Sequence, residues 1–287
     1  VLIEGETGTG KELYAKAIHE MSDRSGKPFY ALNCAAFPET LLESELFGYA
    51  KGAFTGADKD KKGWFATATD STLFIDEIGE ISPSIQVKLL RVLQERTFEP
   101  VGSTKNEKTN ARIIAATNKN LKHLVEQGKF REDLYYRINV IRVELPPLRK
   151  RISDIHVLAF YFLEKYNSIF NRSVSGFSSG ALSALMSHDW PGNVRELENV
   201  IERAVVLSTS DKITQDLFPS ELSDIKEEKP QSAKLSSVKK LTQISFIENA
   251  LKENGFNVPL TAKALGVHKT TLYRIIKKYG IQVESRK

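Results

Sequence analysis

The chain has 287 residues, of which 41% are hydrophobic and 27% charged, as in a water-soluble protein of roughly two domains. No apolar run approaches the roughly 20 residues that a membrane-spanning helix needs, and the N-terminus carries no charged-then-apolar signal segment, so we expect a cytoplasmic protein that does not enter a membrane. The single cysteine, Cys34, excludes a disulfide within the chain and fits a small buried residue better than a nucleophile or a metal ligand.

The net charge of +5 is unevenly distributed along the chain. Residues 229–287 hold 12 Lys or Arg and 3 Asp or Glu, a balance of +9, whereas residues 1–228 hold 29 and 33, a balance of −4. A compact basic segment behind an acidic body is typical of a nucleic-acid-binding appendage, although a merely solvated charged tail gives the same balance.

The N-terminal part of the chain, residues 1–152, predicts an α/β domain. A short buried strand runs directly into a glycine-rich turn and then a helix, and further short apolar runs alternate with helical patterns. This alternation is typical of a parallel sheet covered by helices. The expected strands lie in residues 1–5, 29–35, 71–76, 111–118 and 140–145, and the expected helices include residues 11–21 and 84–96.

From about Ser153 the apolar spacing becomes helical, with no convincing strand, so residues 153–210 are expected to form a small helical lid. Residues 211–240 are rich in Ser, Asp, Glu and Lys and predict a solvated linker. Residues 241–287 supply three helical patterns separated by glycine-containing turns.

The turn after the first strand fits a phosphate-binding P-loop. Its glycines let backbone N–H groups face phosphate oxygens, its lysine reaches the terminal phosphates, and the following helix adds its positive N-terminal end. The residues are Gly5, Glu6, Thr7, Gly8, Thr9, Gly10 and Lys11. The next position, where a P-loop usually has Ser or Thr, is Glu12, so a hydroxyl ligand for Mg²⁺ is lost there.

A pair of carboxylates at the end of a later apolar strand completes this chemistry. Asp76 is expected to hold Mg²⁺, directly or through water, and Glu77 to polarise the attacking water. Together with the P-loop they predict a site for ATP and Mg²⁺. The alternative is a capped helix followed by an exposed acidic turn, which either motif alone would allow.

A third feature is a glycine-flanked segment between these motifs. Two glycines around a Phe and a Thr describe a mobile loop that displays an apolar tip to another protein, or an ordinary loop whose Phe54 packs inward. The segment is Gly52, Ala53, Phe54, Thr55, Gly56 and Ala57, preceded by ESELFGYAKG. This GAFTGA sequence resembles the signature of sigma-54-dependent transcription activators, and the resemblance implies that the loop engages sigma-54 and moves with the nucleotide state.

The resemblance extends over nearly the whole chain, which is similar to the central AAA+ domain and the Fis-like DNA-binding domain of the NtrC family. GETGTGKE is similar to that family's P-loop, including Glu12. Because the chain opens on its first strand, an N-terminal regulatory domain and the upstream residues that hold adenine are expected to be missing.

The same resemblance implies roles for five further residues. Asn33 resembles the switch asparagine that holds Glu77 away from water, and Asn118 resembles the sensor of the terminal phosphate. Arg131 and Arg137 resemble arginine fingers that reach a neighbouring subunit's nucleotide, and Arg195 resembles the lid sensor. The planar cationic fork of arginine suits developing phosphate charge, although any one arginine can equally serve a surface ion pair.

The last two helical patterns predict a helix-turn-helix. Apolar positions have the spacing of two short helices packed across a turn at Gly266, and the second would be the recognition helix. Its outward residues mix phosphate-seeking cations with groups that can meet base edges. They are His268, Lys269, Thr270, Thr271, Tyr273, Arg274, Lys277 and Lys278. By resemblance the segment dimerises on a two-fold site in double-stranded DNA; a basic hairpin used only for oligomerisation is the alternative.

The leading hypothesis is an ATPase that assembles into a ring of six or seven subunits, binds upstream DNA and remodels sigma-54 RNA polymerase holoenzyme. A second is a DNA-binding regulator whose P-loop domain only senses nucleotide. A third is another P-loop motor, such as a helicase or clamp loader, in which GAFTGA is a coincidence.

Overall fold

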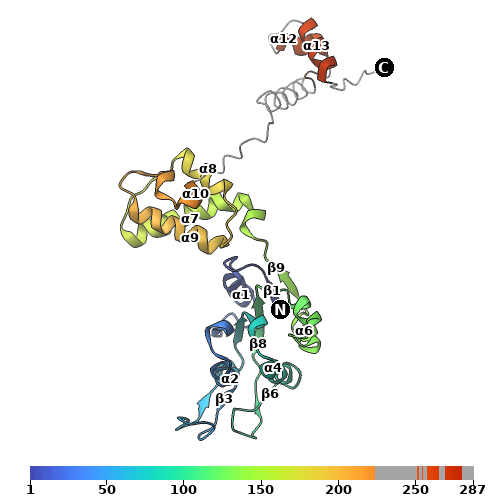
Figure 1. The fold of residues 1–287 in the computed structure, drawn as a ribbon, viewed down its shortest axis with the longest axis vertical. Helices are drawn as coiled ribbons and strands as arrows, with labels where there is room; N and C mark the ends of the chain where they lie inside the picture. Colours follow the sequence, from blue (N-terminus) through green and yellow to red (C-terminus); the bar gives the residue numbers. More distant parts are fainter. Residues whose placement is uncertain (224–250, 252–253, 255–256, 265–268, 280–287) are drawn as a thin grey trace. The chain divides into compact units, whose positions relative to one another are not determined.

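The computed structural model describes residues 1–223, 251, 254, 257–264 and 269–279 (Figure 1). The chain divides into two units, residues 1–223 and 224–287, and each is described by itself. Most of the expected helix at residues 241–255, the linker beyond residue 223 and His268 lie outside the described residues.

The first unit is built around a five-stranded parallel sheet in the order β2-β5-β8-β1-β9. The strands are β1 Leu2–Glu4, β2 Phe29–Asn33, β5 Thr72–Asp76, β8 Arg112–Thr117 and β9 Arg142–Glu144. Each lies within an apolar run of the sequence, and the α/β prediction for this part of the chain is confirmed. Because β1 pairs with both β8 and β9, the chain reverses its winding direction there, where open α/β sheets place their ligands.

Both faces of this sheet are buried, so its strands are almost unbroken runs of apolar residues. Successive side chains alternate between faces: Leu73 and Ile75 join the larger core cluster, whereas Phe74 lies in a smaller cluster with Ala15 of α1. The helices and 3-10 turns of this part are α1 Lys11–Glu20, η1 Cys34–Ala36, α2 Glu39–Phe47, α3 Trp64–Thr67, η2 Ile78–Glu80, α4 Pro83–Glu95, α5 Leu121–Glu126, α6 Glu132–Ile138 and η3 Leu148–Lys150.

Two short antiparallel hairpins extend from this domain, and neither was expected from the sequence. The first pairs β3 Gly48–Tyr49 with β4 Lys61–Lys62, and the second pairs β6 Thr97–Phe98 with β7 Glu107–Lys108. Each strand has only two residues, too few to show an alternating pattern. Tyr49 of β3 also forms a parallel bridge with Val101, so the first hairpin is joined to the segment that connects β6 and β7.

The lid is helical, as expected, with a core of its own. Its elements are α7 Ile152–Phe170, β10 Gly176–Phe177, α8 Ser179–Ser187, α9 Asn193–Leu207, β11 Lys212–Ile213, η4 Gln215–Leu217 and α10 Ser220–Ser223. Trp190 is fully buried in this core and donates from Nε1 to the Leu185 carbonyl over 2.9 Å. Two differences from the sequence analysis follow from the same packing.

The lid contains a strand pair, β10 with β11, where none was expected. It also continues to Ser223 instead of ending at residue 210, because Ile213, Phe218 and Leu222 bury their side chains in the lid core. Residues 211–223 are mostly polar, but these three apolar side chains attach the segment to the lid core.

The second unit contains the helices α12 Val258–Ala264 and α13 Lys269–Tyr279. Ala262 and Leu272 are buried, which agrees with the apolar spacing of a helix-turn-helix. Within the described residues, no helix is both long and apolar enough to cross a bilayer.

Candidate functional site

The carboxyl edge of the sheet gathers most of the predicted phosphate-site residues. Asn33 and Asp76 are register partners at the ends of β2 and β5, and Gly5 and Asn118 directly follow β1 and β8. Carboxyl ends of parallel strands meet at one edge, which makes this edge the place for a ligand.

The P-loop has the backbone that phosphate binding requires. Gly8 and Gly10 have φ values of 79° and 98°, in the left-handed region that glycine adopts without a steric penalty. Thr9 closes the turn by donating from Oγ1 to the Glu6 carbonyl over 2.8 Å. Helix α1 begins at Lys11, so its N-terminal N–H groups and positive dipole end face the loop.

Lys11 and Glu77 lie close together although they are far apart in the sequence. Lys11 is only 6% exposed, donates from Nζ to the Gly5 carbonyl over 3.0 Å and lies 3.7 Å from Glu77 Oε1. The other carboxylate oxygen of Glu77 accepts the backbone N–H of Asn118 over 3.1 Å, and Asn118 Nδ2 donates to Thr7 Oγ1 over 2.9 Å. The P-loop, the Glu77 carboxylate and Asn118 therefore form one connected group.

Asp76 has the properties of a Mg²⁺ ligand that acts together with a nucleotide. Its Oδ1 accepts the Glu77 N–H over 3.0 Å, which fixes the carboxylate at the strand end. No cluster of three or more His, Cys, Asp or Glu that could hold a metal occurs among the described residues. Mg²⁺ commonly takes one or two carboxylates and completes its shell with water and phosphate oxygens, so these residues fit that ion.

Two other predicted residues of the phosphate edge have local partners. The Asn33 side chain accepts the Ala35 N–H over 2.9 Å and caps η1. Glu12 is exposed on α1 and pairs with Lys16 over 2.9 Å, one helical turn away.

The predicted arginine fingers lie on α6 and at its start, and both are exposed. Arg131 pairs with Asp133 over 2.6 Å. Arg137 donates from Nη2 to the Leu93 carbonyl over 3.0 Å, in the last turn of α4, where carbonyls lack helical partners. Arg195 is exposed on α9 of the lid, with its Cβ 3.2 Å from where a Cβ on Gly8 would lie.

The lid touches the P-loop directly, through residues that the sequence analysis missed. Glu6 is bound by both terminal nitrogens of Arg149, at 2.8 and 2.5 Å, and by Asn193 Nδ2 at 3.2 Å. A Cβ on Gly8 would come within 2.3 Å of the Gly192 carbonyl, so only glycine fits there. Asn193 stands two residues before Arg195, but spacing gives no sign of its contact with the P-loop.

The hydrogen bonds from Arg149 and then Asn193 lower the pKa of Glu6 from 4.5 to about 2. A carboxyl group whose pKa is lower in the folded protein than in the unfolded chain stabilises the fold at pH values above its unfolded pKa. This stabilisation is lost as the pH falls through the folded pKa. The Glu6→Gln variant is therefore expected to be less stable than the unsubstituted chain at neutral pH, with the difference shrinking as pH falls from 4.5 toward about 2. Urea unfolding at neutral pH and at about pH 3 measures this; a pH-independent difference would contradict it.

A pocket of about 410 Å³ lies between the P-loop and the lid. Its lining residues are Thr7, Gly192, Arg195, Glu196, Asn199, Val200, Pro219 and Leu222. Arg195 and the P-loop thus border one space, large enough for part of a nucleotide-sized ligand.

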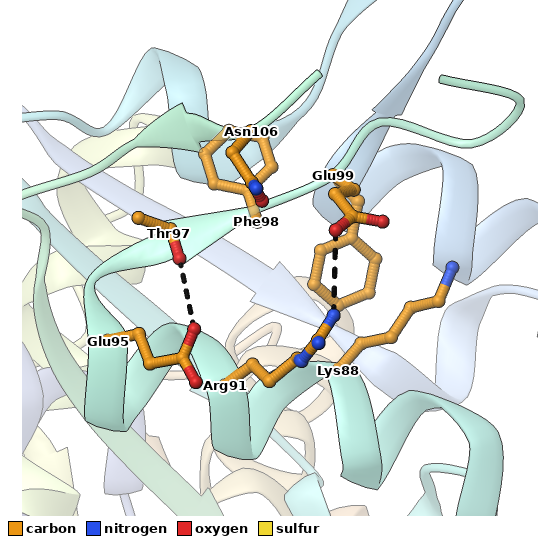
Figure 2. A pocket seen from close by; sticks show the side chains of 8 residues that line it. Lys88, Arg91, Glu95, Thr97, Phe98, Glu99 and Asn106 are labelled. Carbon is orange, nitrogen blue, oxygen red and sulfur yellow. Dashed lines mark hydrogen bonds and ion pairs between the residues drawn. The ribbon is translucent and has the colours of Figure 1, made fainter. Parts of the chain in front are cut away.

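A second, smaller pocket of about 90 Å³ lies between α4 and the β6–β7 hairpin (Figure 2). Its lining residues are Phe47, Lys88, Arg91, Glu95, Thr97, Phe98, Glu99 and Asn106. The two cations are paired, Lys88 with Glu43 over 2.7 Å and Arg91 with Glu99 over 3.5 Å. None of the predicted phosphate-site residues borders it, so we assign it no part in that chemistry.

The GAFTGA segment forms the tip of the β3–β4 hairpin. Gly52 and Gly56 have φ values of 82° and 96°, and Gly52 N–H bonds the Ala57 carbonyl over 2.8 Å to close the loop. Phe54 is 47% exposed, and its ring lies edge-on to Tyr49 at 4.9 Å. The loop thus displays an aromatic and a threonine to solvent.

In the second unit, α13 carries several of the predicted DNA-contacting residues on its exposed face. Lys269, Thr270, Tyr273 and Arg274 are exposed, opposite the buried Leu272. Thr271, Lys277 and Lys278 belong to the same helix. Polar and cationic residues on one face of a short helix are what a groove-reading element needs.

Three families match consecutive parts of this chain. Residues 1–144 match the sigma-54 interaction domain, residues 149–235 the AAA+ ATPase lid domain, and residues 245–279 the bacterial regulatory proteins of the Fis family.

Among curated proteins, the chain is 48% identical to the nitrogen fixation protein AnfA of Azotobacter vinelandii, over 99% of this chain and 54% of that protein. It is also 48% identical to the transcriptional regulatory protein ZraR of Escherichia coli, over 95% of this chain and 62% of that protein. The chain thus spans about half to three-fifths of these relatives.

Among solved structures, NtrX of Brucella abortus in complex with ADP superposes with a TM-score of 0.74 at 32% identity, over 98% of this chain and 64% of that one. The Hsp104–casein complex matches 71% of this chain and 39% of that one, with a TM-score of 0.52 at 19% identity, which shows a shared fold alone.

Proposed function

Because this chain belongs to the sigma-54 interaction domain family, we propose that it activates transcription by hydrolysing ATP to remodel sigma-54 RNA polymerase at a promoter. One observation carries the proposal: a single unit joins the Lys11–Glu77–Asn118 phosphate site to a hairpin that exposes Phe54. An enzyme that only hydrolysed ATP would not need an exposed aromatic loop.

The phosphate edge supports hydrolysis through its own residues. Lys11 and the N–H groups of the P-loop would hold the β- and γ-phosphates, and Asp76 would hold Mg²⁺, which neutralises phosphate charge when bound. Phosphates compete with Glu77 for Lys11, and the freed Glu77 carboxylate could then orient a water for attack. Asn118, bonded to Thr7 and Glu77, would contact the terminal phosphate and so link it to both residues.

A shared interface between subunits would complete the site. Arg131 and Arg137 are exposed, and an arginine supplied by a neighbour stabilises the charge of phosphoryl transfer. We therefore propose a ring of identical subunits, with Arg195 of each lid closing on its own nucleotide. Asn33, beside Asp76, would restrain Glu77 until the loop engages its partner.

The second unit is proposed to bind upstream double-stranded DNA as a dimer, with α13 as the recognition helix. The +9 balance of residues 229–287 supports attraction to phosphates, and the mixture of cations and polar groups supports base contact. DNA binding would place the protein in the bacterial cytoplasm.

The GAFTGA segment gives the decisive test, because Thr55 is not one of the phosphate-site residues. Thr55→Ala is expected to retain most ATPase activity and to lose binding to sigma-54 when trapped with ADP and aluminium fluoride, which stands in for the transferring phosphoryl group. Thr40→Ala, at an exposed position of α2, is the matched control and should retain both. Normal promoter opening by the Thr55 variant would refute a contact role for this loop.

A further inference from the structure

Four consecutive P-loop residues are bonded to the lid or to the segment that leads into it. The contacts are Glu6 carboxylate with Arg149, Thr7 carbonyl with Asn193 Nδ2 at 3.0 Å, Gly8 carbonyl with Val194 N–H at 2.9 Å, and Thr9 carbonyl with Arg151 Nη2 at 3.0 Å. Three successive backbone carbonyls are thus occupied by donors from the lid or from the segment just before it.

These bonds determine where the loop's N–H groups point. In a trans peptide unit the C=O and the following N–H face opposite directions. The bonds to the Thr7 and Thr9 carbonyls therefore turn the N–H groups of Gly8 and Gly10 away from the lid-side donors. Neither N–H donates to another protein group within residues 1–223, which leaves both available to an anion.

Asn193 is the centre of this arrangement. It is fully buried and has a φ of 54°, a left-handed conformation that asparagine tolerates better than most residues. Its Nδ2 donates to the Thr7 carbonyl and to Glu6 Oε2, and its Oδ1 accepts the Leu148 N–H over 2.8 Å. One side chain therefore joins the P-loop, the entry to the lid and the start of α9.

We propose that Asn193 is a positioning residue that holds the phosphate loop in its binding conformation from the lid side. The inference rests on the proposed ATPase function and adds that phosphate affinity depends on a lid residue that need not touch the nucleotide. Because the P-loop binds phosphates in both ground and transition states, loss of this support weakens binding more than it slows chemistry.

The test compares two substitutions at this residue. Asn193→Asp keeps the shape and the acceptor for Leu148 but removes the donors and places a carboxylate beside Glu6; Asn193→Gly keeps the backbone conformation and removes all side-chain bonds without adding charge. Both are expected to weaken ADP binding by about tenfold or more and to raise the KM for ATP similarly, with kcat changed by less than about threefold. Asn171→Asp, at an exposed lid position with a left-handed φ of 51°, is the control with the same charge change and should behave as wild type.

A double variant separates the effect of Asn193 on the P-loop conformation from its effect on the folding stability of the protein. In Glu6→Gln with Asn193→Asp, the glutamine amide can donate to the new carboxylate, which restores the bond between positions 6 and 193 but leaves the Thr7 carbonyl without its donor. Thermal stability without nucleotide should rise above that of Asn193→Asp toward that of Glu6→Gln, whereas ADP affinity should stay low. Recovery of both, or wild-type ADP affinity in both single variants, would overturn the proposal. Failure of the unsubstituted chain to bind ADP would instead count against the proposed function.

Discussion

Glu77→Ala is expected to bind Mg-ATP as well as the unsubstituted chain does and to hydrolyse it about a hundredfold or more slowly, the usual size of a lost general base. Glu77 is the carboxylate nearest Lys11, at 3.7 Å, and its second oxygen is held by the Asn118 N–H. Its removal takes away the group that orients water but leaves the P-loop intact, and it frees Lys11 for phosphate.

Phosphate release and a nucleotide titration, run on the same assembled sample, separate the two effects. Glu80→Ala is the matched control, because Glu80 lies three residues further along, is exposed and pairs with Lys119 over 2.7 Å. Turnover at the wild-type rate in the Glu77 variant would remove Glu77 from the catalytic role. Equal loss in the Glu80 variant would point to a general disturbance of this turn.

Removal of residues 229–287 is expected to abolish specific DNA binding and to leave a folded, nucleotide-binding unit of residues 1–223. All the phosphate-site residues lie in that unit, and among the described residues its two main cores are built entirely from positions 2–222. If the intact protein neutralises six or more phosphates, its affinity should fall about a thousandfold or more between 50 and 200 mM salt.

Single substitutions on α13 should have different effects depending on whether the residue contacts a phosphate or a base. Lys278→Ala is expected to weaken binding to all sequences alike and to flatten the salt dependence, as loss of a phosphate contact does. Arg274→Ala should change the preference among sequences, by roughly 1–3 kcal/mol if it contacts a base edge. A tail that serves only oligomerisation would behave differently: truncation would break the assembly seen by light scattering, and DNA affinity would scarcely change.

The sheet and the main helices were predictable because their signals are local. The apolar runs that contain β5 and β8 are long enough to be recognised, and the helix expected at residues 11–21 is α1, Lys11–Glu20. Once the strands are parallel, their shared carboxyl edge follows, and so does the approach of Glu77, which follows β5, to Lys11 of the P-loop.

The rest depends on contacts that sequence spacing does not reveal. The hairpin strands have two residues each, and the β10–β11 pair joins segments on either side of α8 and α9. The bond between Asn193 and Thr7 spans 186 positions, and an asparagine at the start of a helix has the same local pattern whether it caps that helix or supports a distant loop. The lid was extended to Ser223 by isolated apolar anchors in a polar segment.

At Glu77 the backbone conformation favours one type of residue, whereas the proposed chemistry requires another. Its φ of 53° and ψ of 46° lie in the left-handed region, which costs a side chain other than Gly or Asn about 1–2 kcal/mol. At the end of α7 the same conformation is occupied by Asn171, a residue suited to it. Evolutionary drift toward greater thermostability would favour Gly or Asn at position 77, and either would remove the carboxylate. If Glu77 orients the attacking water as proposed, such a chain would still fold and bind nucleotide but would hydrolyse it about a hundredfold or more slowly, so a regulator that mainly senses nucleotide would be one stabilising mutation away.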